Sequence, residues 1–232
     1  MTLTLTKQDW AGIFPKAPSS IIEAFSDNRE PLDAAGITAS RVRLAYALAN
    51  VEHECDGYSI RDLTENINYT AERMAEVWPK RFDSAEAVRE RYGTAKGWQK
   101  KAFDDIYGGR TGNRKGTDDG SMYIGRGGPQ ITGREGYIEV GARAGLDLVD
   151  DVNLVTIAEN QPIILAAFWS WKDLNKFADR GDFSGCVKAW NGGTNGLADR
   201  KIRMAGNDPI ISRLSNLAAN LTTVGAVIMS KI

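Results

Sequence analysis

Two glutamates, Glu54 and Glu65, have surroundings and spacing that could support catalysis by carboxylates. Glu54 lies in the stretch VEHECDG and Glu65 in the stretch LTENINY. Hydrolysis of a glycosidic bond needs such a pair: a protonated carboxyl for the leaving oxygen, and an ionised carboxylate for water or the sugar cation. The chain contains 30 acidic residues, however, so spacing alone does not separate this pair from solvated surface carboxylates.

Other catalytic side chains are scarce. The single histidine, His53, excludes a His-rich metal site and weakens any Ser-His-Asp or Cys-His proposal, and a lone histidine is more often structural than catalytic. Two cysteines, Cys55 and Cys186, do not imply a disulfide framework. Carboxylates are therefore the groups left for proton transfer, and we expect neither a metal nor a cofactor.

A glycine-rich stretch, Tyr123–Tyr137 (YIGRGGPQITGREGY), is the second chemical signal. Glycine costs roughly 0.5–1 kcal/mol inside a helix or strand relative to alanine, so this stretch is a poor core element. It predicts the floor of a binding cleft, with an ordinary glycine-rich connector as the alternative. A phosphate loop is disfavoured, because Gly128 breaks the G-x-x-G spacing and no buried strand precedes it.

The elements that must position these residues are helices. Ser40 can cap a helix from Arg41 to about Cys55, with apolar positions at i, i+3, i+4 and i+7. Continuing this periodicity places Cys55 on the buried face and Glu54 at its margin. A carboxylate at such a margin is partly desolvated, which suits a general acid.

Further helices follow from capping residues and apolar spacing. We expect them at 70–77, at 84–91, from Asn160 and Pro162 onward, from Asp182 to Trp190, and from near Leu197. The aromatic cluster Phe168, Trp169 and Trp171 is predicted to be mainly core rather than a sugar-stacking platform. No convincing alternating strand pattern is present, so the fold class predicted is mainly α with little β structure.

The net charge, the N-terminal residues and the chain length limit the functions that we expect. The formal net charge is −1, which gives no indication of nucleic-acid binding. The first ten residues, MTLTLTKQDW, lack the pattern of a signal peptide, so we expect synthesis in the cytoplasm. At 232 residues the chain can bury a sizeable core.

The C-terminal segment differs from the rest, and we divide the chain into a domain over 1–208 and a tail over 209–232. From Leu214 to Ser230 there is no charged residue, and apolar residues repeat at helical spacing. Asparagine, threonine and glycine make it a poor transmembrane span. Docking on the domain is favoured, with weak membrane-surface contact through 210–232 as the alternative.

Five motifs occur in an order that resembles the family 19 glycoside hydrolases, nearest to phage endolysins and bacterial lysozyme-like members. The resemblance covers about residues 5–206. The motifs are HE at 53–54, ENINY at 65–69, IYGGRTGN at 106–113, YIGRG with QITGR within 123–134, and NGGTNGLADR at 191–200.

The resemblance implies a two-lobed, lysozyme-like fold around a central saccharide cleft. It implies that Glu54 is the general acid, Glu65 the base that activates water, and that Thr132 helps to hold that water. Family members invert the anomeric centre, which places the carboxyl groups roughly 6.5–9.5 Å apart. The remaining site residues that it implies are the substrate contacts Tyr123, Arg126, Gln130, Asn191 and Arg200, with His53 bracing the acid.

The function implied is that of a monomeric phage-type endolysin, a muramidase that cuts β-1,4 bonds of peptidoglycan glycan strands. Such an enzyme would remain in the host cytoplasm until a holin-like pore releases it to the cell wall. The alternative enzyme is a chitinase acting on β-1,4 N-acetylglucosamine polymers. The alternative outside the enzyme class is a non-catalytic saccharide-binding or virion protein.

Overall fold

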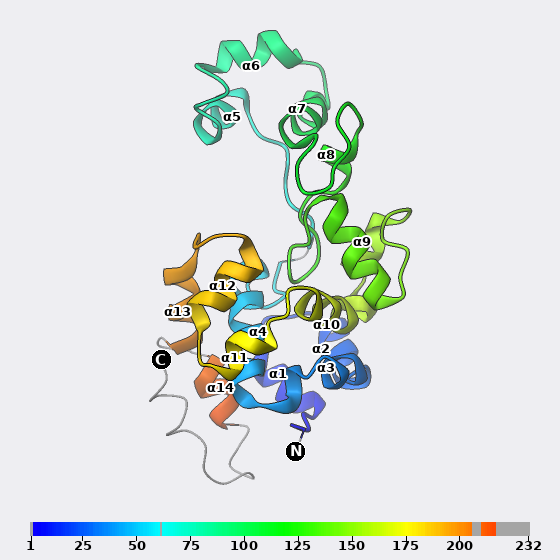
Figure 1. Ribbon diagram of the computed structural model, residues 1–232, viewed down its shortest axis with the longest axis vertical. Coiled ribbons are helices and arrows are strands. Elements are labelled where there is room, and N and C mark those ends of the chain that lie inside the picture. The colour runs from blue at the N-terminus through cyan, green and yellow to red at the C-terminus, as the bar shows by residue number, and fades with distance from the viewer. Residues whose placement is uncertain (1, 61, 206–209, 217–232) are drawn as a thin grey trace.

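The computed structural model describes residues 2–60, 62–205 and 210–216, and helices account for nearly all of its regular structure (Figure 1). Within these ranges, the β structure consists of two isolated antiparallel bridges, Thr64 with Arg126 and Arg126 with Ile131. The helices are arranged in two lobes. The prediction of a mainly α, two-lobed fold is confirmed.

The larger lobe, here called the lower lobe, is built around one central helix. This helix is α4 (Arg41–Cys55), and every residue from Leu44 to Glu52 is buried. Around it lie α1 (Lys7–Ile13), α2 (Ser19–Asp27), α3 (Glu30–Ala34), α9 (Gly133–Ala144), α10 (Gln161–Trp171), α11 (Asn175–Asp179), α12 (Phe183–Asn191), α13 (Leu197–Ala205) and α14 (Ile210–Asn216). Short 3-10 turns occur at Ile37–Ala39, Val152–Thr156 and Ala158–Asn160.

The upper lobe is an insertion between α4 and α9 with its own hydrophobic cluster. It contains α5 (Ala71–Val77), α6 (Ala85–Tyr92), α7 (Trp98–Tyr107) and α8 (Asp119–Met122). The sequence did not predict α7, because its buried side has only Ala102, Phe103 and Ile106 among many polar residues. Two connections join the lobes, one from α4 to α5 and one from α8 to α9.

The helix starts predicted from sequence are confirmed where a side chain caps the helix. Ser40, Thr70, Ser84 and Asp182 each accept a hydrogen bond from a backbone amide three residues later, at 3.2, 3.1, 3.2 and 2.8 Å. These bonds satisfy amide groups that have no partner within the first helical turn. Local sequence therefore sets where these helices begin.

The described part of the C-terminal tail, α14, packs on the lower lobe. Ile210 and Leu214 are buried, and Arg213 donates to the Glu52 carboxylate at 2.5 Å and to the Ile13 carbonyl at 2.9 Å. No helix in the described residues is long and apolar enough to cross a membrane. Residues 217–232 lie outside the described ranges, so membrane contact through them stays a prediction.

Candidate active site

Glu54 lies near the C-terminal end of α4, where a buried arginine holds its side chain. Arg200 of α13 donates to Glu54 Oε1 at 2.5 Å, and its other terminal nitrogen donates to Asn50 Oδ1 at 2.6 Å. The Arg200 side chain is 1% exposed, whereas that of Glu54 is 17% exposed. Charge-assisted hydrogen bonds of this kind fix orientation strongly. Arg200 thus positions Glu54 from behind and does not line the cleft.

His53 supports this arrangement indirectly. Its Nδ1 lies 2.6 Å from Asp199 Oδ2, one residue before Arg200, and its ring packs against Gly196. A Cβ at position 196 would lie 2.4 Å from His53 Nε2, so glycine permits this close approach. His53 therefore ties α4 to the start of α13, the helix that carries Arg200.

Glu65 is placed by pairing between the two connections that join the lobes. Its backbone amide donates to the Gly125 carbonyl at 2.8 Å, and the Gly125 amide donates to Glu65 Oε2 at 3.1 Å. The neighbouring amide of Gly127 donates to the Leu63 carbonyl at 2.9 Å. The glycine-rich stretch thus acts as the backbone partner of the segment that carries Glu65.

Three polar side chains converge on Gly125. A Cβ at that position would lie 2.7 Å from Gln130 Oε1, 3.3 Å from Glu65 Oε2 and 3.4 Å from Thr132 Oγ1. Gln130, which has a positive φ of 56°, is held by hydrogen bonds from its Nε2 to the Leu63 and Gly127 carbonyls. The missing side chain at 125 therefore makes room for this polar group.

Glu54, Glu65 and Thr132 line one cleft of about 400 Å³, together with Gln130 and Asn191. The other lining residues are Thr111, Gly125, Pro129, Phe168, Trp171, Lys172, Trp190 and Gly192. A second hollow of about 650 Å³ also includes Glu65 and continues between the α4–α5 connection and the start of α7. Glu65 therefore borders two hollows.

Besides Arg200, two further predicted substrate contacts lie outside the cleft lining. Tyr123 is 3% exposed, and its hydroxyl donates to the Val149 carbonyl at 3.3 Å. Arg126 is 9% exposed and donates to the Met122 carbonyl and to the Tyr137 hydroxyl at 2.6 and 2.7 Å. We correct their assignment: both hold the α8–α9 connection in place, and neither lines the cleft.

The glycines of Tyr123–Tyr137 also have different roles from the one expected. An added Cβ at Gly127 would lie 2.9 Å from Val155, and one at Gly128 would lie 2.3 Å from the Tyr58 hydroxyl and 2.5 Å from its ring. At Gly136 it would lie 3.0 Å from Ile131 and 3.6 Å from Trp171. These glycines allow close packing within the protein, and only Gly125 faces the polar cluster.

Sequence reasoning missed part of the cleft wall. Phe168, Trp171 and Trp190 line it, although the aromatic cluster of α10 was expected to be core; Trp169, at 0% exposure, is core. Phe168 and Trp171 are three residues apart and so share a helix face. The cleft also contains Lys172, for which the sequence offered no signal.

The described residues offer few alternatives to carboxylate chemistry. Burial raises the pKa of both thiols, Cys55 and Cys186, to about 12, so neither supplies a thiolate nucleophile near neutral pH. No group of three or more His, Cys, Asp or Glu side chains there could hold a metal ion.

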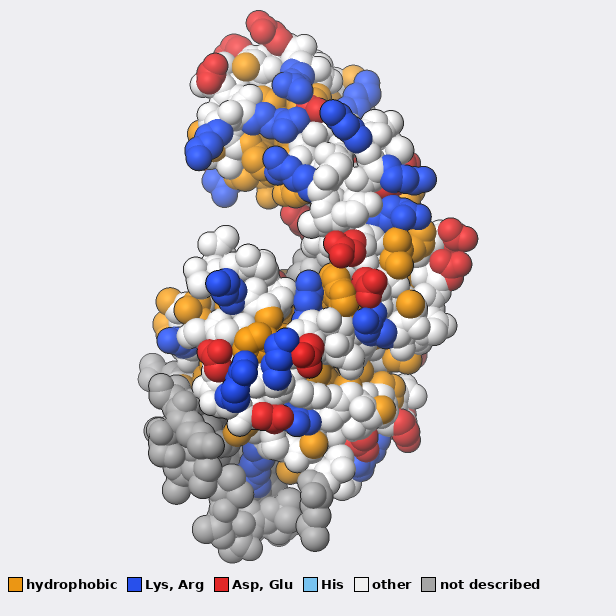
Figure 2. All heavy atoms as spheres, in the orientation of Figure 1, with side chains coloured by type: hydrophobic (Ala, Val, Ile, Leu, Met, Phe, Trp, Pro, Cys, Tyr) orange, Lys and Arg blue, Asp and Glu red, His pale blue; other side chains and the backbone are white. Residues whose placement is uncertain are grey.

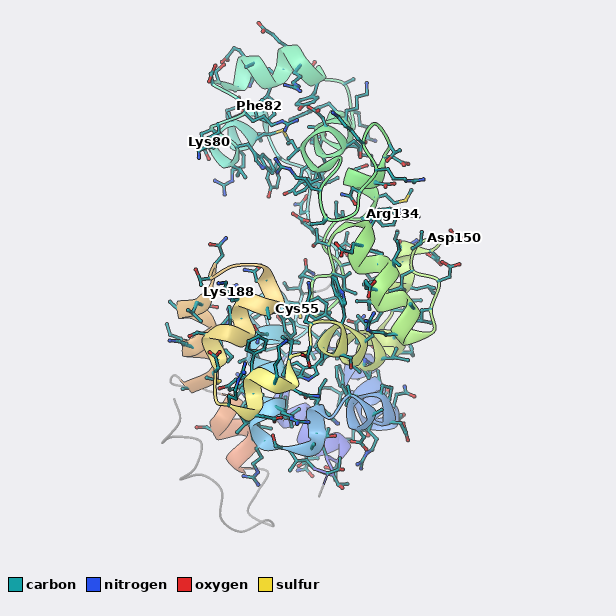
Figure 3. All side chains as sticks on the ribbon, viewed as in Figure 1. Cys55, Lys80, Phe82, Arg134, Asp150 and Lys188 are labelled. Carbon is teal, nitrogen blue, oxygen red and sulfur yellow. The ribbon has the colours of Figure 1, made fainter. Side chains whose placement is uncertain are left out.

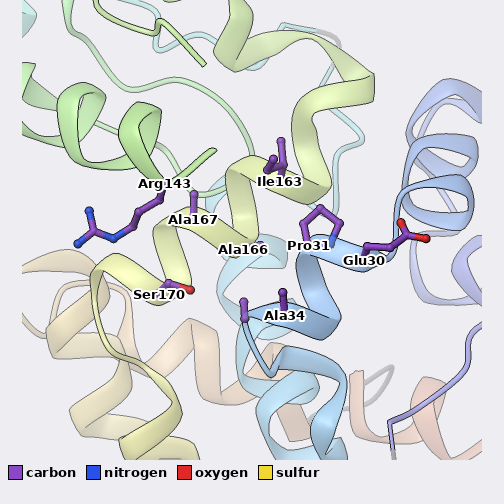
Figure 4. A pocket seen from close by; sticks show the side chains of 9 residues that line it. Glu30, Pro31, Ala34, Arg143, Ile163, Ala166, Ala167 and Ser170 are labelled. Carbon is purple, nitrogen blue, oxygen red and sulfur yellow. The ribbon is translucent and has the colours of Figure 1, made fainter. Parts of the chain in front are cut away.

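A separate groove of about 520 Å³ lies between α3, α9 and α10 (Figure 4). Its lining is mainly small and apolar, and Glu30 is the one carboxylate among its described lining residues. A two-carboxylate hydrolysis therefore fits the cleft of Glu54 and Glu65 and does not fit this groove.

Comparison with known proteins finds a relative of the family that the motifs resemble. No protein-family model matches the chain. The chain is 29% identical over 205 residues to a glycosyl hydrolase family 19 domain-containing protein from Haemophilus influenzae, a match that covers 86% of this chain and 94% of the relative. The predicted resemblance to glycoside hydrolase family 19 and the prediction of a glycoside hydrolase are confirmed.

The structure of this glycoside hydrolase is also similar to two solved chitinases. Chitinase C from Streptomyces griseus HUT6037 is 18% identical, with a TM-score of 0.49, and the match covers 98% of this chain and 77% of that one. A bacterial family 19 chitinase is 18% identical, with a TM-score of 0.45 and coverage of 93% and 92%.

Proposed function

We propose that this family 19 hydrolase is a phage-type endolysin, a muramidase that cleaves β-1,4 bonds of peptidoglycan. The observation that carries the catalytic part is the presence of Glu54 and Glu65 in one cleft, each held by different partners. Glycoside hydrolysis requires two carboxyl groups in distinct environments, one as acid and one as base.

In the proposed mechanism, Glu54 gives a proton to the glycosidic oxygen that leaves. Glu65 takes a proton from a water molecule, which attacks the anomeric carbon from the opposite face, so the configuration is inverted. Thr132, close to the same side of Gly125 as Glu65, accepts or donates a hydrogen bond to that water. Gln130 and Asn191 line the cleft and contact the sugars.

The shape of the molecule supports a polymeric substrate. Figure 2 shows the surface hollowed between the upper lobe and the α12 side of the lower lobe, and this notch is open to the solvent. Lys188 on α12 and Lys80 beyond α5 lie on opposite sides of the notch (Figure 3). An open notch lets a long glycan strand enter sideways without threading a chain end through a closed pocket.

Product analysis tests both substrate and bond. The purified hydrolase would be incubated with isolated peptidoglycan and, separately, with N-acetylglucosamine oligomers, and the products would be identified by mass spectrometry. A new reducing end on N-acetylmuramic acid is expected. A reducing N-acetylglucosamine end on peptidoglycan would refute the muramidase assignment, and cleavage of the oligomers alone would make the protein a chitinase.

The proposal includes the route to the wall. The hydrolase would accumulate in the host cytoplasm and act after a holin-like pore opens. Expression in a Gram-negative host should then leave the culture turbid until a membrane-permeabilising agent is added. Lysis without that agent would contradict this part of the proposal, and a Glu54→Gln variant supplies the inactive control.

A further inference from the structure

The lining of the cleft includes a cationic side chain that the proposed catalytic mechanism does not use. Among the described residues that line the cleft of Glu54 and Glu65, Lys172 is the one cationic side chain. It follows the last residue of α10, and its Nζ lies 3.6 Å from the ring centroid of Trp171 and 5.8 Å from that of Phe168. Both rings line the same cleft.

The aromatic rings hold this ammonium group but do not neutralise it. A cation over an indole face is attracted by the ring, with a geometry that keeps the side chain in place. No ion pair of Lys172 occurs within the described part of the chain, and Glu135, the carboxylate with the largest effect on it, is exposed. Burial lowers the pKa of Lys172, which indicates that the ammonium has lost part of its hydration.

A partly desolvated ammonium in a binding cleft favours an anionic ligand group, because an ionised acceptor forms the stronger hydrogen bond. A chitin strand carries only hydroxyl and acetamido groups and offers no such acceptor. A peptidoglycan strand carries a lactyl branch on every second sugar, and that branch ends in a carboxylate or continues into a stem peptide that bears carboxylates.

We propose that Lys172 is a specificity-determining residue that binds a carboxylate of the lactyl branch or its stem peptide, so that the cleft prefers peptidoglycan to chitin. This inference rests on the proposed peptidoglycan function. The two sources share one chemistry, a carboxylate attached through the 3-position of muramic acid.

The test compares Lys172→Met with two matched variants. Lys172→Arg keeps the charge and the ring contact. Lys176→Met removes a lysine that also lies over an aromatic ring, Phe177 at 5.2 Å, but pairs with Asp173 and does not line the cleft. For each variant, kcat/KM is measured on isolated peptidoglycan, on glycan strands stripped of peptides by an amidase, and on N-acetylglucosamine oligomers.

The readout is the ratio of kcat/KM on a peptidoglycan substrate, intact or stripped, to kcat/KM on the oligomers. Lys172→Met should lower this ratio about 10-fold, mainly through KM, as expected for loss of one charge-assisted hydrogen bond. Lys172→Arg and Lys176→Met should keep the ratio of the wild type. A fall on the stripped strands alone identifies the lactyl carboxylate, which is tied up as an amide where a stem peptide is attached, and a fall on intact peptidoglycan alone identifies a carboxylate of the stem peptide.

Two results overturn the inference while leaving the proposed function intact. One is an unchanged ratio in Lys172→Met on both the intact and the stripped substrate, and the other is an equal loss on peptidoglycan and oligomers, which would show a purely structural role. If the wild type cleaves the oligomers and leaves peptidoglycan intact, the proposed function and this inference both fail.

Discussion

The two lobes are stabilised by different means. The lower lobe encloses α4 on all sides, and it buries charge: Arg200 pairs with Glu54, and Arg213 pairs with Glu52, whose side chain is 10% exposed. The upper lobe has a smaller core of mainly apolar and aromatic contacts, and several of its ion pairs are largely solvent-exposed, although the Asp119 carboxylate that pairs with Arg114 is buried. A solvent-exposed ion pair contributes little to stability, so the upper lobe depends chiefly on its small core.

This difference extends to the two carboxylates. Glu54 belongs to the lower lobe and is fixed by a buried side-chain network. Glu65 lies where the upper lobe joins the lower lobe, and backbone hydrogen bonds to Gly125 fix it. The acid therefore depends on helix packing, and the base depends on the pairing of two connections.

The largest expected effects come from Glu54→Gln and Glu65→Gln, each of which should lower kcat about 10²–10⁴-fold. Their stabilities should differ. Glu54→Gln leaves buried Arg200 without its charged partner and should cost about 1–3 kcal/mol, whereas Glu65→Gln should cost less, because the glutamine oxygen can still accept from the Gly125 amide. Urea unfolding of both variants, with exposed Glu76→Gln as control, measures this contrast. Equal stability of the two variants would contradict it.

Replacement of the buried arginine tests the lower-lobe network directly. Arg200→Met removes the donor to both Glu54 and Asn50 and should lower the free energy of unfolding by about 3–5 kcal/mol. Arg73→Met, which removes an exposed ion pair with Glu76, is the matched control. It should change the free energy of unfolding only slightly. If the two variants unfold at the same urea concentration, the buried network does not stabilise the lower lobe.

A small substitution in the paired connections between the lobes tests how Glu65 is positioned. The Cβ of Gly125→Ala would crowd Gln130, Glu65 and Thr132, and the resulting displacement should lower kcat about 10²-fold. Gly193→Ala is the control, since nothing lies within 4 Å of its added Cβ. Steady-state kinetics on peptidoglycan measures the loss of kcat, and thermal unfolding of the same variants shows whether the fold is kept. A lower kcat with an unchanged unfolding temperature indicates displaced side chains. Wild-type kcat in Gly125→Ala would show that the polar group tolerates a methyl.

The smallest expected effect is a pH-dependent one in the upper lobe. Hydrogen bonds from Arg114 lower the pKa of buried Asp119 to about 2. Because this folded-state pKa lies below the unfolded value of about 4, the contribution is complete above that pH and is lost as the pH falls towards 2. Asp119→Asn should therefore cost about 2 kcal/mol at pH 7 and little near pH 2.

Urea unfolding across this pH range, compared with exposed Asp118→Asn, measures the effect. If Asp119→Asn still lowers the free energy of unfolding at low pH, Asp119 stabilises the fold through packing and not through its charge.

Much of the candidate site could be predicted from sequence because the motifs are local and ordered. Glu54, Glu65 and Thr132 do line one cleft, with Gln130 and Asn191 beside them. Their catalytic roles stay predictions that the variants above test.

The rest could not be predicted, because it depends on which way a side chain points. Tyr123 and Arg126 lie in the same motif as Gln130, yet both turn into the protein interior. Lys172 follows a helix end, where no periodicity indicates direction, and only the packing of α10 places it in the cleft.

The sequence by itself determined where the helices capped by Ser40, Thr70, Ser84 and Asp182 begin, the mainly α class and the resemblance to family 19. These depend on short-range signals: a cap binds an amide three residues away, and apolar spacing repeats within a few turns. Tertiary structure alone decided how the acids are held, because Arg200 reaches Glu54 across 146 positions and Gly125 reaches Glu65 across 60. Contacts over such separations form only when helices pack and chain segments pair.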